Sequence, residues 1–392
     1  MKKEGIFRFS EATWLILGAL LLRLLLWWGK FGRADYPHLF RDDEVYWQAG
    51  QDLWQSGLIG SHKVMPGLPL LDGLLGFPGI VYFNILLSSL TVGLVFIWAK
   101  ELQSSVKLAW WTACLVAISP GLLYFSNHAY TESSFTFLLI QGLWALQQKR
   151  MWLACVSLVL SVLIRPTLDV INPILILLAA WDWHGERGTK LALRLGQYSL
   201  VYLLLLSPWW LHQHQKYGTW VRLHLGGGEV MYHGQVNLPQ LTSLDDTAVY
   251  NLSLFESIAD PQLRNQAMQD SVLKYWRSHP FNLPKGTLLN GIKFWLGTPE
   301  VFYGPFAYVA GLWQHAGFLL LLMAVIFNPE LRKRKWLPLW LLTAYFTAIH
   351  ALLHGMPRYR LPLEPVIWMM VLAAWGHKLG LGQSKAALPD ES

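Results

Sequence analysis

The chain has 392 residues, of which 54% are hydrophobic and 14% are charged. Soluble domains carry about 25% charged residues, so this composition excludes an ordinary soluble enzyme and predicts an integral membrane protein. A net charge of +7 would suggest nucleic-acid binding in a soluble protein. In a membrane protein the excess Lys and Arg orients the helices instead, so we expect contact with membrane lipids and no nucleic-acid partner.

Apolar segments long enough to approach a membrane span recur along the whole chain. A span needs roughly 20 apolar residues, and by that measure the sequence predicts about ten helices. Neither an internal repeat nor a low-complexity tract interrupts them, so we expect one all-α membrane domain over residues 1–392, without a C-terminal soluble domain. The predicted spans lie near 12–29, 79–98, 108–126, 131–148, 151–165, 168–183, 191–212, 304–327, 336–353 and 361–378.

The short loops alternate in basic charge, as the positive-inside rule requires. With a cytoplasmic N-terminus, basic runs such as "RKRK" at 332–335 all fall on the inner side. The first loop, about 30–78, and a long loop, about 213–303, then face outward. Amphipathic helices are predicted in these loops over 44–57, 261–279 and 285–297, lying along the membrane surface. We therefore expect an active site on the outer face.

Three consecutive carboxylates, Asp42, Asp43 and Glu44, stand where the first outer helix begins. Acidic side chains stabilise a helix N-terminus, which is one explanation for them. Capping needs a single acid, however, and crowded carboxylates disfavour each other's ionisation. The alternative is a catalytic carboxylate at the membrane surface, acting as a general base.

Further outer-face residues carry charge that a lipid environment makes costly. His62 and Lys63 precede a Pro/Gly-rich bend at 65–69, where Lys63 meets either an anion or lipid phosphate. Glu132 begins the fourth predicted span and is explained equally well as a helix-starting acid. Arg165, in "LIRPT", lies near membrane depth, where an Arg usually has a partner or binds a functional anion.

The segment "HGMPRYRLPLEP", 354–365, places two arginines beside a tyrosine at the mouth of the last span. Arg358 and Arg360 suit phosphate recognition, and interfacial anchoring together with Tyr359 is the alternative. Metal ligands are sparse: His350 and His354 share a helix face, but no third ligand accompanies them. We predict no dedicated metal site.

Taken in order, these motifs resemble a family. An acidic "DDE" with aromatics, a Lys before a Pro/Gly-rich bend, "SPG…YFS…TE", "RPT", "SPWW…YG…GG" and "PRYRLPLEP" are similar to the bacterial family 39-type glycosyltransferases of the GT-C class. Protein O-mannosyltransferases and lipid A aminoarabinose transferases are similar too. The resemblance covers residues 14–378 and implies a GT-C fold with juxtamembrane helices on the outer face. It also implies a polyprenyl-phosphate sugar as donor, in a bacterial inner membrane with the site on the periplasmic or extracellular side.

Residue roles carried over from this resemblance are specific. The family's catalytic acid matches the Asp43–Glu44 pair, its donor-phosphate Lys matches Lys63, and its Arg-Tyr pair matches Arg358 and Tyr359. The chain departs from the family in two places: His212 and Gln213 replace an Arg-Asn pair, and His62 replaces a Glu that holds a metal in some relatives. No cofactor is therefore expected to be required, although a divalent cation stays possible.

The combined hypothesis is an inverting glycosyltransferase that moves a monosaccharide to a hydroxyl of a lipid, glycan or protein acceptor. Asp43 acts as the general base, and Glu44 orients it or binds a sugar hydroxyl. Tyr46 stacks on a sugar face. Cationic side chains stabilise the departing phosphate: Lys63, Arg165, Arg358 and Arg360.

Two alternatives to the glycosyltransferase stay open. One is a polyprenyl-linked glycan ligase or polymerase, for which Arg222, His224 and His233 would be the central residues. The other is a lipid or solute transporter. Transporters concentrate ionisable residues at mid-membrane, often within repeats, whereas the charged candidates here lie at the outer ends of the predicted helices.

Overall fold

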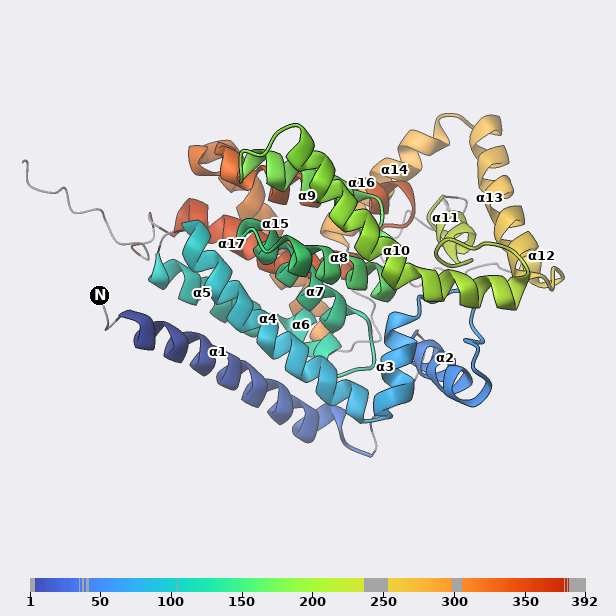
Figure 1. Cartoon of the computed structure of the whole chain (residues 1–392), viewed down its shortest axis with the longest axis horizontal. Coiled ribbons are helices and arrows are strands. Elements are labelled where there is room, and N and C mark those ends of the chain that lie inside the picture. Colours follow the sequence, from blue (N-terminus) through green and yellow to red (C-terminus); the bar gives the residue numbers. More distant parts are fainter. Residues whose placement is uncertain are drawn as a thin grey trace, which may run out of the picture.

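The computed structural model describes residues 4–34, 36, 39, 42–103, 105–235, 253–297, 305–376, 378 and 380, and all regular structure in them is helical (Figure 1). The prediction of an all-α chain is confirmed for these residues. The bundle is built from apolar helices: α1 (Glu4–Leu26), α4 (Gly79–Gln103), α5 (Val106–Ala117), α6 (Pro120–Ser126), α7 (Glu132–Gln147), α8 (Met151–Ile164), α9 (Ile171–Asp182), α10 (Thr189–Tyr217), α15 (Pro305–Phe327), α16 (Leu337–Leu352) and α17 (Glu364–Trp375).

Four described helical segments are long and apolar enough to cross a membrane: Glu11–Phe31, Gly79–Gln103, Thr189–Tyr217 and Ala307–Phe327. A fifth results if α5 and α6, bent by 55° at their junction, are taken as one span. The remaining predicted segments coincide with shorter helices, such as α8 and α9. The chain is thus built as a multi-pass membrane protein, while the number of ten spans stays a prediction.

Helix α4 lies inside the bundle and packs against α1, α5 and α7. Its apolar residues surround the helix axis, as expected of a helix buried on most sides. Arg23 of α1 is also fully buried. It donates hydrogen bonds to Ser88 Oγ (2.9 Å) on α4 and to the carbonyl of Ala19 (3.1 Å). The hydrogen bond to Ser88 fixes α1 against α4.

Shorter helices cover one end of the bundle, on the right in Figure 1, and we call this the decorated end. The predicted amphipathic helices are confirmed there as α2, α13 and α14. Asp260 caps α13, because its side chain accepts the amide hydrogens of Gln262 (2.7 Å) and Leu263 (3.0 Å). The decorated end comprises α2 (Asp42–Ser56), α3 (Gly67–Leu75), α11 (Gly227–Gln235), α12 (Ser253–Glu256), α13 (Pro261–Ser278) and α14 (Asn282–Leu296).

Candidate functional site

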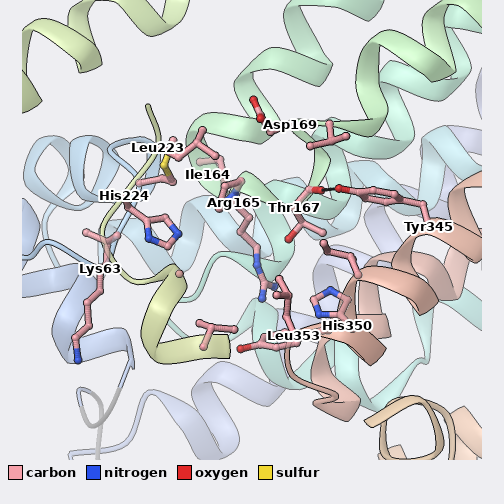
Figure 2. A pocket seen from close by; sticks show the side chains of 18 of the residues that line it. Lys63, Ile164, Arg165, Thr167, Asp169, Leu223, His224, Tyr345, His350 and Leu353 are labelled. Carbon is pink, nitrogen blue, oxygen red and sulfur yellow. Dashed lines mark hydrogen bonds between the residues drawn. The ribbon is translucent and has the colours of Figure 1, made fainter. Parts of the chain in front are cut away.

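A pocket of about 370 Å³ opens between the bundle and the decorated end (Figure 2). Its cationic groups are Lys63 and Arg165. Figure 2 shows Arg165 reaching into the middle, with Lys63 and His224 to one side and Tyr345 and His350 to the other. Much of the remaining wall is apolar, formed by Val64, Met65, Ile164, Val170, Leu223, Val230, Ile349 and Leu353. Such a lining suits a ligand that combines an anionic group with a hydrocarbon chain.

Arg165 occupies this place because the chain turns at the end of α8. Pro166 follows it, and the residue before a proline is driven out of the helical conformation, so Arg165 is extended (φ −146°, ψ 128°). Its guanidinium donates to Glu132 Oε1 (3.1 Å) and lies 4.9 Å from the ring centre of Tyr359. Glu132 is almost fully buried at the first turn of α7, where the helix dipole favours a negative charge. The predicted partner of Arg165 is therefore Glu132.

The three consecutive carboxylates diverge, because successive residues of a helix point about 100° apart. Asp42 is half-exposed and forms an ion pair with Arg358. Arg358 belongs to the 3-10 helix η7 (Pro357–Leu363) and also lies over the ring of Tyr359, 5.4 Å from its centre. Asp43 is fully buried, and its Oδ1 accepts the amide hydrogen of Glu44 (3.1 Å). The Glu44 side chain is exposed and lines a separate shallow hollow along α2.

Two tyrosines join these charges to the pocket. Burial raises the pKa of Tyr46 well above its usual range, and the neighbouring charge of Asp42 raises it further. Burial likewise raises the pKa of Tyr359, while Arg358 and Arg165 oppose that shift. Both phenols therefore stay protonated and can donate hydrogen bonds. Six predicted residues thus gather in what we call the acid–arginine cluster: Asp42, Tyr46, Glu132, Arg165, Arg358 and Tyr359.

On the other side of the pocket, Lys63 forms an ion pair with Glu229 of α11 (2.6 Å). His233, one helical turn further along α11, lies 3.6 Å from the same carboxylate. Burial would raise the pKa of Glu229, but hydrogen bonds from His233 and Lys63 outweigh it and lower this pKa to about 2. We call these three residues the Lys63 cluster. Lys63, which was predicted to contact an anion, is thus held by the carboxylate of Glu229.

Two imidazoles near Lys63 are disfavoured from carrying charge. Burial, together with a smaller effect of His62, lowers the pKa of His224 to about 4. The pKa of His62 is lowered by burial and by the charge of Lys63. The backbone carbonyl of His62 accepts the amide hydrogen of Leu225 (2.8 Å), which holds the Lys63 segment against the chain leading into α11.

The structure places two other predicted residues away from the pocket lining. His212, near the end of α10, accepts the amide hydrogen of Ile59 through Nε2 (3.0 Å) and so supports the loop before Lys63. Arg360 is buried and donates to Gln314 Oε1 (2.7 Å) and to the carbonyl of Phe294 (2.8 Å). His212 therefore holds the backbone of the loop before Lys63, and Arg360 holds the helices that carry Phe294 and Gln314.

Several residues of the site were not proposed from the sequence. Thr167 and Asp169 follow Arg165 in "RPTLD", where proximity to a costly arginine was a usable signal. Tyr345 donates to the carbonyl of Thr167 (2.7 Å), the contact drawn in Figure 2. Glu229 follows the "GGG" run and gave no local signal. Among the described residues, no three His, Cys, Asp or Glu side chains gather in a way that could hold a metal ion. That no cofactor is required stays a prediction.

No protein-family profile and no curated protein sequence matches the chain. Solved structures do. The apo oligosaccharyltransferase of Archaeoglobus fulgidus superposes with a TM-score of 0.59 at 14% identity over 96% of this chain. The oligosaccharyltransferase AglB of the same organism, in complex with an inhibitory peptide and a dolichol-phosphate, gives 0.57 at 13% identity over 97%. The fold is that of the GT-C class.

The GT-C likeness concerns the fold and not the whole of those proteins. This chain covers 51% and 52% of the two oligosaccharyltransferase chains, so it spans about half their length. A structure of ArnT from Cupriavidus metallidurans bound to undecaprenyl phosphate also matches, with a TM-score of 0.43 and 14% identity over 94% of this chain and 79% of that one. The predicted GT-C fold is confirmed, whereas membership of the family 39-type and a bacterial origin stay predictions.

Proposed function

We propose that this protein is a membrane glycosyltransferase that transfers a sugar from a polyprenyl-phosphate donor to an acceptor hydroxyl, with inversion at the anomeric carbon. The observation that carries the proposal is the pocket lining. Two cations, Lys63 and Arg165, stand in a largely apolar cavity that is also lined by Tyr46 of α2, one helical turn after Asp42. A lipid phosphate fits the cations and its chain fits the apolar wall, while the sugar would extend toward the acids.

The chemistry assigned to the chain is a single displacement. The acceptor O–H bond breaks as its oxygen bonds to the anomeric carbon, and the electron pair of the carbon–phosphate-oxygen bond leaves with the phosphate. The proton goes to Asp43. Arg165 and Arg358 stabilise the negative charge that builds on the leaving group, as fixed donors aimed at developing charge do. We assign Asp43 as the base because Arg358 already engages Asp42.

This assignment carries a structural requirement. Asp43 is fully buried, so an acceptor hydroxyl reaches it only if the first turn of α2 moves. Catalytic hydrogen bonds often tighten only when substrate is bound, so the covered position is compatible with a base. Asp42 is the competing choice, and substitution of each acid separately tells them apart.

The test is a transfer assay with purified protein in lipid nanodiscs and a panel of polyprenyl-phosphate monosaccharides. Wild type is compared with Asp43→Asn and Asp42→Asn, and with Asp52→Asn as a matched control on the same helix. We expect one donor to be consumed by wild type and the control and spared by Asp43→Asn. If Asp42→Asn alone abolishes transfer, the base is reassigned. If wild type consumes no donor, the monosaccharide proposal fails.

A second candidate is transfer of an oligosaccharide from a lipid carrier. The two structures with the higher TM-scores are oligosaccharyltransferases, one of them bound to dolichol-phosphate, and this supports adding oligosaccharide donors to the panel. His224, which lines the pocket, would then contact the glycan. Transfer that survives Asp43→Asn but is lost in His224→Ala would favour this candidate.

A further inference from the structure

A second cavity lies at the end of the bundle away from the decorated end, on the left in Figure 1. Its volume is about 370 Å³, within the range of about 300–1,000 Å³ found for small-molecule sites. It forms where the chain leaves α15, passes through the 3-10 helices η5 (Pro329–Arg332) and η6 (Arg334–Trp336), and enters α16. We call it the basic hollow, and it is lined by Val325, Leu331, Arg332, Lys333, Arg334, Leu337 and Trp340.

Contacts with two other helices fix the position of the basic hollow. Lys335 donates to the carbonyl of Leu102 (3.0 Å), near the C-terminal end of α4. Trp183, directly after α9, donates to the carbonyl of Lys335 (3.2 Å). Helix α4 starts against α3 at the decorated end and has 25 residues, so it rises about 37 Å before it reaches Lys335. The basic hollow and the candidate site therefore face opposite sides of a membrane that α4 crosses.

The charges around the basic hollow are unbalanced. Its basic run, residues 332–335, supplies four cations. Both lysines of the run pair with the single carboxylate of Glu330, and Arg334 pairs with Asp182. Four cations against two carboxylates leave an excess of two positive charges. An anionic ligand would supply the missing charge.

Arg332 is held ready for such a ligand. Its guanidinium donates to the carbonyl of Ile326 (3.1 Å) in the last turn of α15, where the helix leaves carbonyl groups without an internal partner. In the part of the chain that the structure describes, no carboxylate pairs with Arg332. The backbone contact therefore restrains the side chain while other guanidinium hydrogens point elsewhere. A guanidinium suits phosphate, whose oxygens accept two parallel N–H bonds.

The wall beside these cations is apolar and continues along α15. Val325 lines the basic hollow, and Leu322 and Leu319 lie one and two turns before it, all three with exposed side chains. In a membrane-spanning helix such exposed apolar side chains contact lipid. A ligand with its phosphate on Arg332 would lay its hydrocarbon along this face. The positive-inside rule accounts for a basic run, but it requires neither a cavity nor an apolar wall.

We propose that the basic hollow binds an anionic phospholipid, with its phosphate on Arg332 and Lys333 and its acyl chains along α15. Basic pockets between membrane helices bind such headgroups. A zwitterionic phospholipid carries the same phosphate together with a cation, which the excess positive charge repels. The site therefore selects lipids by net charge. This inference is independent of the proposed function, because no step of it involves sugar transfer.

The test is a titration of purified protein in neutral detergent micelles with fluorescent phosphatidylglycerol, at physiological ionic strength. Arg332→Gln/Lys333→Gln should raise Kd about 25-fold, since each basic residue near an anionic lipid contributes about fivefold. Lys149→Gln/Lys190→Gln is the matched control, because it removes the same charge from exposed positions outside the hollow. Salt screens such exposed charges, so we expect the control to change Kd by about twofold at most. Equal rises in both variants would overturn the proposal, because net charge alone would then explain binding.

A second variant separates the cavity from its charge. Val325→Trp keeps every cation but fills the basic hollow, and we expect it to bind phosphatidylglycerol no better than the charge variant does. Full binding by Val325→Trp would overturn the proposal, and this variant stays decisive if the charge variant does not fold.

Two further ligands test the lipid assignment on wild type. Phosphatidylcholine should bind more weakly than phosphatidylglycerol, and equal affinities would refute selection by charge. Excess inorganic phosphate should not displace phosphatidylglycerol, because it makes no contact with the apolar wall. Complete displacement would show that the basic hollow is a site for free phosphate and not for a lipid.

Discussion

Replacing Glu132 by Gln should expose the cost of an uncompensated charge next to the pocket. The carboxylate is 2% exposed and the Arg165 side chain 14%, with 3.1 Å between their atoms. Removing one member of a buried ion pair costs about 3–5 kcal/mol. The ring of Tyr359, whose centre lies 4.9 Å from the guanidinium, still stabilises the charge of Arg165 in this variant. We therefore expect about 3 kcal/mol of destabilisation, at the lower end of that range.

The assay is equilibrium unfolding in mixed detergent micelles at fixed lipid composition. Glu330→Gln serves as the matched control, because Glu330 pairs with the well-exposed Lys333 and Lys335, and such surface pairs contribute about 0–1 kcal/mol. The double variant Glu132→Gln/Arg165→Met should recover most of the lost stability, since no charge is then left buried alone. A Glu132→Gln variant as stable as the control would refute the view that this carboxylate compensates Arg165.

Four shorter predictions concern the same end of the molecule. In the proposed mechanism Arg358→Ala removes a fixed cation at the leaving group, so sugar transfer should slow by about 10²–10³-fold; near-normal kcat would take Arg358 out of the site. Glu229→Gln should tighten binding of polyprenyl phosphate, measured by nanodisc titration, because Lys63 loses its competing carboxylate; weaker binding would mean that Glu229 positions Lys63. The folded-state pKa of Glu229 is lowered to about 2, below its unfolded value of about 4.3. Ionised Glu229 therefore stabilises the protein above about pH 4.3, and this stabilisation is lost as the pH falls toward 2. Glu229→Gln should reduce the fall in melting temperature over that pH range. Gly234→Ala should loosen α11, because the new Cβ would lie 1.5 Å from the carbonyl oxygen of Leu353, and faster hydrogen exchange in α11 would report it.

Helix positions were predictable because they depend on local composition. An apolar run with a proline or glycine at its end has few alternatives in lipid, so the predicted segments coincide with helices. Arg165 was also recognisable, since a charge in such a run needs a reason. Its partner Glu132 belonged to the predicted set, but the pairing of the two residues depends on how α7 and α8 pack.

The directions of individual side chains were beyond sequence reasoning. Asp42, Asp43 and Glu44 read as one acidic triplet, yet packing turns one toward Arg358, buries the next and leaves the third exposed. His212 has the chemistry of a substrate ligand but accepts a backbone amide.

The ion pair between Asp42 and Arg358 joins positions 316 residues apart in the chain. Chains emerge from the ribosome N-terminus first, at about 5–20 residues per second, so α2 exists well before η7 has been made. Asp42 is therefore synthesised long before the arginine with which it pairs. A nascent chain of this protein therefore holds Asp42 without its counter-charge until Arg358 has been made.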